Sequence, residues 1–249
     1  MPSNPSNTVG ILEPTIPVDQ SIYETSTTQK TRLGTRLKVG DRVFRYAQLA
    51  ASSNEVAGTL VCEPLALSSY VSAVLTVSAA TTGATSISVT GSAAITAGVF
   101  NEGYLSIAST ALAGGGLVFR VKNQASGGAT IVLTLYDPIP SSIGAGPCSL
   151  VPNAYKAVKP DDKTIANAAG VLPVNVTTGE YFWVQTWGPA SPRHSAATPA
   201  GAALILGTAG CVEGYTAGGA SSGERVIGMN SNLIAVATQC CPVQLCIQL

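Results

Sequence analysis

Few residues of this chain have the chemistry that catalysis needs. The only histidine, His194, lies in a Ser-Pro-Arg-His-Ser segment, with Ser191 and Ser195 close to it in sequence. A Ser-His-Asp mechanism needs an exposed nucleophile and a carboxylate that orients the imidazole, and no Gly-x-Ser-x-Gly elbow is present to expose a serine. Asp161 and Asp162 are adjacent on a predicted turn, unlike a spaced acid–base pair. We therefore predict no catalytic residue and no enzymatic activity, and we expect His194 in a loop at a surface or a subunit contact.

The cysteines do not form a convincing metal site. Cys240, Cys241 and Cys246 are the only cluster among six cysteines. Structural zinc sites usually combine two pairs of ligands, whereas adjacent residues of a strand point to opposite faces. We predict no metal and no cofactor, and we expect free, mostly buried thiols, with a disulfide or a metal site as the less favoured alternatives.

The composition points to a protein that is covered by other proteins. Only 10% of the residues are charged, against about 25% in an ordinary soluble domain. Ser, Thr, Ala and Gly take the place of the charged residues that normally keep a surface soluble, so we infer that much of the surface contacts other subunits. Thirteen acidic residues balance thirteen basic ones, which makes nucleic acid an unlikely partner, and no apolar run is long enough for a membrane helix.

Residues 1–30 are predicted to form an extended N-terminal arm, because they are rich in proline and small polar residues. Ile11, Leu12, Ile16 and Val18 are spaced like anchors on an extended segment, so we expect them to dock onto a neighbouring subunit; an unattached terminus is the alternative. The first ten residues have neither a basic region nor an apolar core, so we expect no signal peptide and synthesis in a cytosol.

A basic hairpin is predicted to follow the arm. Gly40-Asp41 suits a two-residue turn, since glycine tolerates positive φ at its first central position. Arg36, Lys38, Arg42 and Arg45 surround that turn, and we interpret them as contacts with an acidic surface. A solvated hairpin face is the alternative, and nucleic acid is the weaker one, because no aromatic residues alternate with the cations.

The rest of the chain predicts an all-β fold. Short runs of alternating apolar and polar residues are separated by Gly-rich turns, which is typical of an antiparallel β-sandwich or barrel of short strands. Strands are expected at 74–77, 86–90, 104–107, 117–121, 131–135, 171–176, 203–206, 226–227, 233–236 and 243–249. Residues 141–170 are expected to be mostly loop, with one helical turn at 166–169. Residues 31–249 thus form one β-rich domain, and a division into two β subdomains near 141–160 stays open.

The densest aromatic stretch is expected to nucleate the core. Tyr181, Phe182, Trp183 and Trp187 are four of the 14 aromatic residues of the chain, and they fall within seven positions. As a strand, this stretch has large apolar groups on both faces, which is typical of a central strand covered on both sides. We predict these four residues to be structural core.

Two stretches resemble structural proteins of tailed bacteriophages. Leu33-Gly34-Thr35, followed by Gly40-Asp41-Arg42-Val43-Phe44-Arg45-Tyr46-Ala47, is similar to the opening of phage head proteins that combine an "LGT" with a "dGr-(F/Y)-R-Y" hairpin. Gly170-Val171, followed by Gly179-Glu180-Tyr181-Phe182-Trp183-Val184-Gln185-Thr186-Trp187-Gly188, is similar to their "GV…(Y/F)xWVQTxG" segment. The resemblance covers about residues 30–249 and leaves out the arm.

The resemblance implies a virion protein, and most plausibly a capsid decoration (cement) protein on the capsid surface. Such a protein would bind the major capsid protein as a homotrimer and stabilise the shell, with no small-molecule substrate and no membrane. The alternatives are another virion component (tail, adaptor, fibre or capsid subunit) or, less favoured, a carbohydrate-binding β protein that stacks Trp183 or Trp187 on sugar rings.

Overall fold

The all-β prediction is confirmed. The computed structural model describes residues 19–64, 70–71, 74–109, 113–160, 167–215, 225–231 and 239–247, so residues 1–18 of the predicted arm lie outside the described part. The regular elements are β1 (Arg36–Val39), β2 (Arg42–Gln48), β3 (Leu60–Cys62), β4 (Leu75–Val77), β5 (Ser86–Ile95), β6 (Tyr104–Ile107), β7 (Val118–Gln124), β8 (Gly128–Leu135), β9 (Gly146–Val151), β10 (Ala168–Val171), β11 (Tyr181–Ala190), β12 (Ala203–Leu206), the 3-10 helix η2 (Thr208–Gly210), β13 (Val212–Gly214), β14 (Gly228–Asn230) and β15 (Val243–Cys246).

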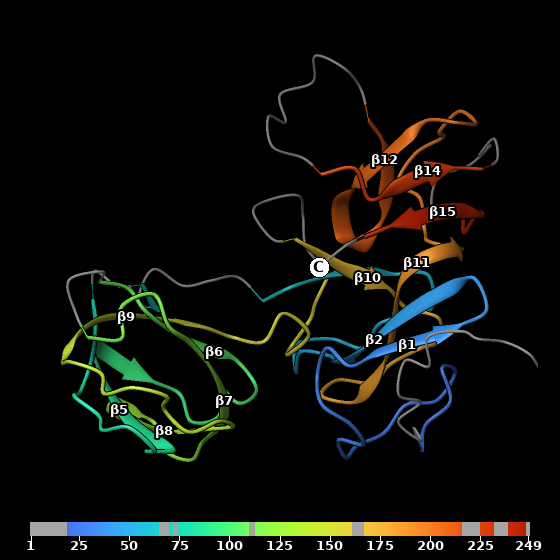
Figure 1. Ribbon diagram of the computed structural model, residues 1–249. Helices are drawn as coiled ribbons and strands as arrows, with labels where there is room; N and C mark the ends of the chain where they lie inside the picture. The colour runs from blue at the N-terminus through green and yellow to red at the C-terminus, as the bar shows by residue number, and fades with distance from the viewer. Residues whose placement is uncertain are drawn as a thin grey trace, which may run out of the picture.

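The strands form one closed barrel and one larger sheet. The barrel has the order β4-β5-β8-β7-β6-β9 and closes where β4 pairs with β9. The nine-stranded sheet has the order β1-β2-β11-β15-β14-β12-β13, and β10 joins β3 to β11 beside this path. Figure 1 shows the barrel, mostly green, beside the sheet, whose strands come from the blue and the orange parts of the chain.

The barrel is an insertion between two paired strands. The chain leaves the sheet after β3 and returns to it at β10, and these two strands pair with each other through Cys62 and Ala168. The connections into and out of the barrel therefore start from adjacent strands. The entropy cost of closing a connection between two paired strands grows only slowly with the length of that connection. A whole barrel can therefore be inserted between β3 and β10 without disturbing the sheet.

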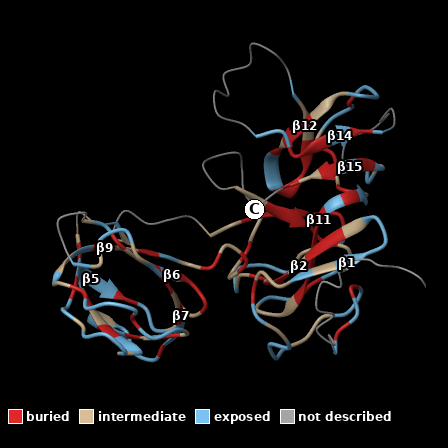
Figure 2. Cartoon of the chain, in the orientation of Figure 1, coloured by how far each residue is buried: buried red, intermediate tan, exposed pale blue. Residues whose placement is uncertain are grey.

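Alternation of side chains explains why these segments are strands. On β5, Ile87 and Val89 are buried while Ser86 and Thr90 are exposed, and Ile131 on β8 is buried in the same barrel interior. The sheet buries two apolar clusters, one around Trp183 and one around Leu245. Figure 2 shows the buried residues concentrated along the strands and the exposed ones in the connections.

Two sequence-based expectations for residues 141–170 are corrected. β9 lies in the part of the chain that was expected to be mostly loop, yet it is a barrel strand that buries Cys148 and Leu150. Ala168 and Ala169 belong to β10 rather than to a helical turn, since β3 and β11 supply ladder partners on both sides. The secondary structure of such short segments depends on pairing partners that are distant in sequence, because a run of three or four residues has little intrinsic strand propensity.

The predicted strand boundaries toward the C-terminus shift slightly. The strand expected at 171–176 ends at Val171, before Pro173, and the one expected at 226–227 begins at Gly228. β12 lies where it was expected. β15 begins at Val243 as expected but ends at Cys246, and Ile247 is not part of the strand. The strand expected at 233–236 and the last two residues of the chain lie outside the described residues.

Candidate functional site

The site is built on the pairing of the basic hairpin with the aromatic strand. β1 and β2 form the predicted hairpin, with Val39 opposite Arg42 on either side of the Gly40-Asp41 turn. β2 pairs in turn with β11, where Tyr46 lies opposite Trp183. The two stretches that carry the phage resemblance are thus neighbours in one sheet.

A β-bulge turns Trp187 out of the core. The register between β2 and β11 shifts between Gln185 and Trp187, and a bulge of this kind re-aims the side chains that follow it. Gln185 is buried, and its Nε2 donates to the main-chain oxygens of Trp187 and Pro189 at 3.1 and 2.7 Å. At Gly188, with φ +86°, a side chain would collide with the main-chain oxygen of Asp41.

Trp187 is therefore a correction to the predicted core. Its side chain is 40% exposed, whereas Phe182 and Trp183 are fully buried and Tyr181 is half-buried. Strict alternation along a regular strand would have placed Trp187 with Tyr181 and Trp183. The exposed indole is the one large aromatic group that this strand offers to a partner.

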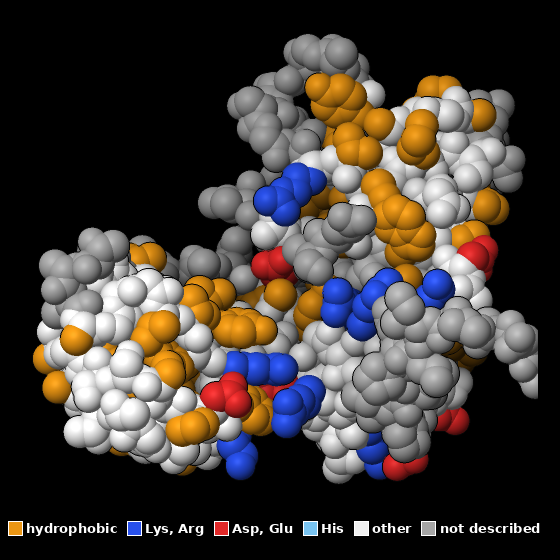
Figure 3. Space-filling model, in the orientation of Figure 1, with side chains coloured by type: hydrophobic (Ala, Val, Ile, Leu, Met, Phe, Trp, Pro, Cys, Tyr) orange, Lys and Arg blue, Asp and Glu red, His pale blue; other side chains and the backbone are white. Residues whose placement is uncertain are grey.

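Trp187 separates two surface grooves. The first, called here the hairpin groove, has a volume of about 730 Å³ and is lined by Trp187 together with Arg36, Lys38, Arg45 and Ile247, among others. The second, the Arg225 groove, measures about 380 Å³ and also contains Trp187 and Ile247. In Figure 3 Lys and Arg side chains gather beside exposed hydrophobic ones near the β1–β2 hairpin.

The ladder register puts three of the four predicted cations on one face. Arg36 lies directly opposite Arg45, and Lys38 lies opposite Val43, so these side chains share the face that borders the hairpin groove. The guanidinium of Arg45 also donates a hydrogen bond of 2.9 Å to the main-chain oxygen of Gly34. Arg42 lies on the other face, where its guanidinium packs 5.4 Å from the centre of the Phe44 ring and donates to the hydroxyl of Tyr23.

The carboxylates near the two grooves are few. Asp41 lines the hairpin groove. Glu63 lies close enough to Arg225 to be stabilised by it electrostatically, yet burial is the larger effect and raises the pKa of Glu63. Among the described residues, the grooves therefore combine cationic side chains with an exposed indole, which suits an anionic ligand that also carries an apolar or planar group.

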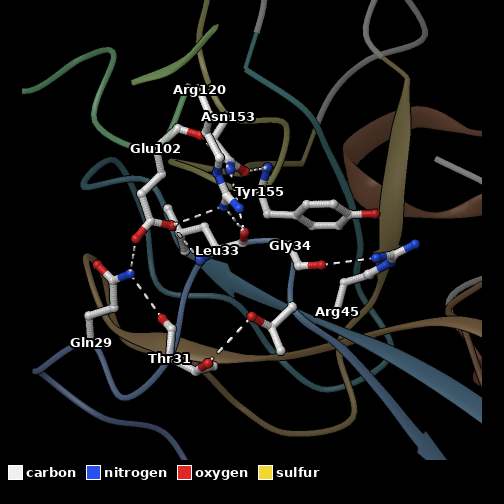
Figure 4. A network of polar contacts seen from close by, with 10 residues as sticks. Gln29, Thr31, Leu33, Gly34, Arg45, Glu102, Arg120, Asn153 and Tyr155 are labelled. Atoms are coloured by element: carbon white, nitrogen blue, oxygen red, sulfur yellow. Dashed lines mark hydrogen bonds and ion pairs between the residues drawn. The ribbon is translucent and has the colours of Figure 1, made fainter. Parts of the chain in front are cut away.

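A polar network fixes the barrel against the sheet beside this hairpin (Figure 4). Glu102, in the turn before β6, accepts hydrogen bonds from the main-chain N–H of Leu33 at 2.6 Å and from Nε2 of Gln29 at 2.8 Å. Nδ2 of Asn153 donates to the main-chain oxygens of Glu102 and Leu33. Arg120 lies 3.9 Å from the carboxylate of Glu102. The segment that leads into the hairpin is thus held by side chains of the inserted barrel.

His194 is not in the surface loop that the sequence suggested. Its side chain is fully buried, and neither ring nitrogen has a hydrogen-bond partner among the described residues. Burial lowers the pKa of His194, so the imidazole is held neutral. The nearby hydroxyl of Ser195 interacts with Val212 and Glu213 instead. The backbone accounts for this placement, because the main chain of His194 and Ser195 bonds to Gln239 and Val212.

None of the six cysteines forms a disulfide, and the expectation that most are buried holds only in part. Cys62, Cys148 and Cys211 are buried, Cys241 and Cys246 are half-buried, and Cys240 is exposed. Burial raises the pKa of Cys148 to about 11, which keeps this thiol protonated. Within the described residues no group of three His, Cys, Asp or Glu side chains is arranged to hold a metal ion.

Sequence reasoning identified the cations but missed their neighbours. Ile247 and Arg225 lie far along the chain from the hairpin and reach the grooves only through the pairing of β11 with β15. Ile11, Leu12, Ile16 and Val18, the predicted anchors, lie outside the described residues. No helix in the described part of the chain has the length and apolar character needed to cross a membrane. The chain matches no family model, no curated protein and no solved structure.

Proposed function

We propose that this chain is a structural protein of a virion: a bacteriophage capsid decoration protein that binds the outer shell as a homotrimer and stabilises it. The observation that carries the proposal is an apolar stripe on the outside of the barrel. Tyr104 on β6, Val151 on β9 and Val118 on β7 are exposed by 42%, 50% and 61%. Tyr104 lies directly opposite Val151 in the β6–β9 ladder.

The stripe is an outer surface with no role in filling the barrel. Its strands already bury Leu105, Leu150 and Phe119 inside. Val118 lies opposite the small residue Ser106, and Tyr104 lies opposite Arg120, whose guanidinium is turned toward Glu102 and the Tyr136 ring. In Figure 3 hydrophobic side chains gather on the barrel over β6 and β9. Contiguous exposed apolar surface on regular strands is typical of a protein–protein interface.

Two further observations favour a shell-bound oligomer. The charged fraction of 10% is low for a protein whose whole surface faces water. The two stretches that resemble phage head proteins lie side by side as β2 and β11. A protein that binds only the assembled shell stabilises the assembled state by mass action, which is the physical mechanism of a cement protein.

The first test is the oligomeric state of the purified protein, measured by light scattering during gel filtration. We expect a trimer for the wild type. We expect Tyr104→Thr and Val118→Thr to raise the trimer dissociation constant by about tenfold or more each, because each removes apolar contact area from an interface. Val132→Thr is the matched control, since Val132 is also exposed on the barrel but lies on β8.

The second test is binding to shells. Empty shells without decoration protein would be mixed with the purified chain and sedimented. Saturable co-sedimentation, together with a higher melting temperature of the shells, is the expected result. A protein that stays monomeric at high concentration and remains in the supernatant would contradict the proposal. Copy number per virion, measured by quantitative mass spectrometry, distinguishes a shell protein with hundreds of copies from a tail or adaptor component with few.

A further inference from the structure

A third hollow of the surface, called here the Arg42 cleft, has a volume of about 450 Å³. Most of its lining is apolar and includes Val171, Leu172, Pro173 and Pro189. Among the described residues that line it, only Arg42 carries a charge. The cleft therefore suits an extended apolar segment that contains a single carboxylate.

Two contacts hold Arg42 in place at this cleft. Its guanidinium donates to the hydroxyl of Tyr23 at 3.2 Å and lies 5.4 Å from the centre of the Phe44 ring. A guanidinium has five N–H donors in a planar fork, so it can bind a carboxylate while both contacts remain. Because the cation is already positioned, little further entropy is lost when an anion binds to it.

The described chain begins beside the cleft. The side chain of Gln20 is buried and accepts a hydrogen bond of 2.8 Å from the hydroxyl of Tyr46. Arg42 and Tyr46 are four residues apart on β2, so their side chains point to the same face of the sheet. Tyr23, three residues after Gln20, lines the cleft itself. Residues 1–18 therefore join the described chain on the face that carries the cleft.

The first 18 residues have the composition that the cleft suits. Glu13 is the only charged side chain among them, and apolar residues flank it, with Leu12 before it and Ile16 after it. Pro14 and Pro17 restrict the backbone of the free segment, which lowers the conformational entropy lost on binding. The segment thus offers one carboxylate to the one cation of the cleft.

The length of the connection permits binding within one chain. Glu13 lies seven residues before Gln20, and seven extended residues span up to about 23 Å. The distance from Tyr46, where Gln20 is held, to Arg42 is about 13 Å along β2. A segment tethered so closely binds at an effective concentration in the millimolar range, which favours it over a separate protein with the same sequence.

We propose that residues 11–18 bind in the Arg42 cleft of their own chain, with the carboxylate of Glu13 on the guanidinium of Arg42 and the neighbouring apolar side chains against Leu172 and Pro189. Docking on a neighbouring subunit, the expectation from the sequence, is the competing arrangement. The assignment does not rest on the proposed function, because it concerns the free protein before any shell is present.

The test uses the thiol of Cys240 as a reporter, because Cys240 is exposed and lines the cleft. The full-length parent protein carries Cys241→Ser and Cys246→Ser, since these half-buried thiols would also react. The rate of reaction with a bulky maleimide is measured by mass spectrometry. Glu13→Lys is expected to raise this rate by about tenfold, because it brings like charges together. Ile16→Ser, which changes no charge, is expected to raise it by about threefold or more.

A charge swap locates the contact. Arg42→Glu alone is expected to raise the labelling rate of Cys240 by about tenfold. The double variant with Glu13→Lys and Arg42→Glu is expected to return to within about twofold of the parent rate, because the two charges attract again. Asp137→Lys is the matched control, since it makes the same change in net charge at an exposed position of the barrel, and it is expected to leave the rate unchanged.

A peptide provides a measurement that does not depend on the folding of Arg42→Glu. An acetylated peptide of residues 9–18 is added to the full-length Glu13→Lys variant, whose cleft is expected to be open. We expect saturable protection of Cys240, and no protection by the same peptide with Lys in place of Glu13.

Four outcomes would overturn the proposal. They are equal labelling rates for Glu13→Lys and Asp137→Lys, no recovery in the double variant, equal protection by the two peptides, and a parent rate that rises on dilution. The last result would assign the arm to a neighbouring copy. Trimer formation and shell binding are measured separately, so a failure here differs from a failure of the proposed function.

Discussion

The indole N–H of Trp183 donates a hydrogen bond of 3.1 Å to the main-chain oxygen of Gln20, 163 residues away in the sequence. The side chain of Gln20 is also buried, and it accepts from the hydroxyl of Tyr46 and donates to the main-chain oxygen of Tyr181. The Tyr46 ring meets the edge of the Trp183 ring with centroids 5.1 Å apart. The first described segment is thus attached to the central strands of the sheet.

Trp183→Ala is expected to lower the free energy of unfolding by about 3–5 kcal/mol, because it leaves a cavity in the core and an unpaired carbonyl at Gln20. Urea denaturation followed by circular dichroism measures the change. Trp187→Ala is the control, with an expected change within about 0.5 kcal/mol because that side chain is partly exposed and faces the groove. Equal losses for the two variants would show that Trp187 is core after all.

Glu102→Gln is expected to destabilise the protein by about 1.5–3 kcal/mol, because the carboxylate accepts from both Leu33 and Gln29 at the junction of barrel and sheet. The neutral amide accepts through one oxygen only. Glu24→Gln makes the same change in charge in an exposed turn, where Glu24 accepts from the main-chain N–H of Ser21. Equal urea midpoints for the two variants would rule out a structural role of the junction carboxylate.

The pH dependence of stability in mild acid is expected to come from His194. The folded protein keeps this buried imidazole neutral, so its pKa lies below that of the unfolded chain, which is about 6.5. Stability from this group is therefore complete above pH 6.5 and is lost as the pH falls through the folded pKa. Because the chain has one histidine, its imidazole proton resonances give that pKa directly. His194→Leu is expected to flatten the stability profile just below pH 6.5; an unchanged profile would contradict this assignment.

Alkaline stability is expected to depend on Tyr155. Burial raises the pKa of this phenol to about 12, against about 10 in an unfolded chain. The stability contributed by the neutral phenol is complete below pH 10 and is lost as the pH rises toward 12. The hydroxyl has no hydrogen-bond partner among the described residues, so Tyr155→Phe is expected to be neutral or slightly stabilising at pH 7.

The measurement is urea denaturation between pH 9 and 11 for the wild type and Tyr155→Phe, with exposed Tyr23→Phe as the control. Tyr46 also has a raised pKa because of burial, so the wild type and both variants share a background loss of stability. The difference between the wild type and Tyr155→Phe isolates Tyr155. A curve for Tyr155→Phe that parallels the wild type would contradict the prediction.

Local sequence patterns were sufficient to predict the elements that are formed by residues close to one another in the sequence. The Gly40-Asp41 turn predicted the β1–β2 hairpin, and the alternation of Ile87 and Val89 with hydroxyl residues predicted β5. β9 was missed because the turn-forming residues within 141–170 predicted a loop. In the structure, Cys148 and Leu150 complete a barrel whose other strands come from distant segments. No local signal marks that context.

By itself, the sequence determined that the chain is all-β, where most strands lie, and that its cations gather around one hairpin, because side-chain alternation and turn chemistry act over a few residues. Only the tertiary structure decided that the strands divide into a closed barrel and a nine-stranded sheet, that His194 is buried, and that Trp187 is exposed beside Arg36 and Ile247. The physical reason is that ladder pairing joins segments more than a hundred residues apart, and one bulge in such a ladder reverses the face on which a side chain lies.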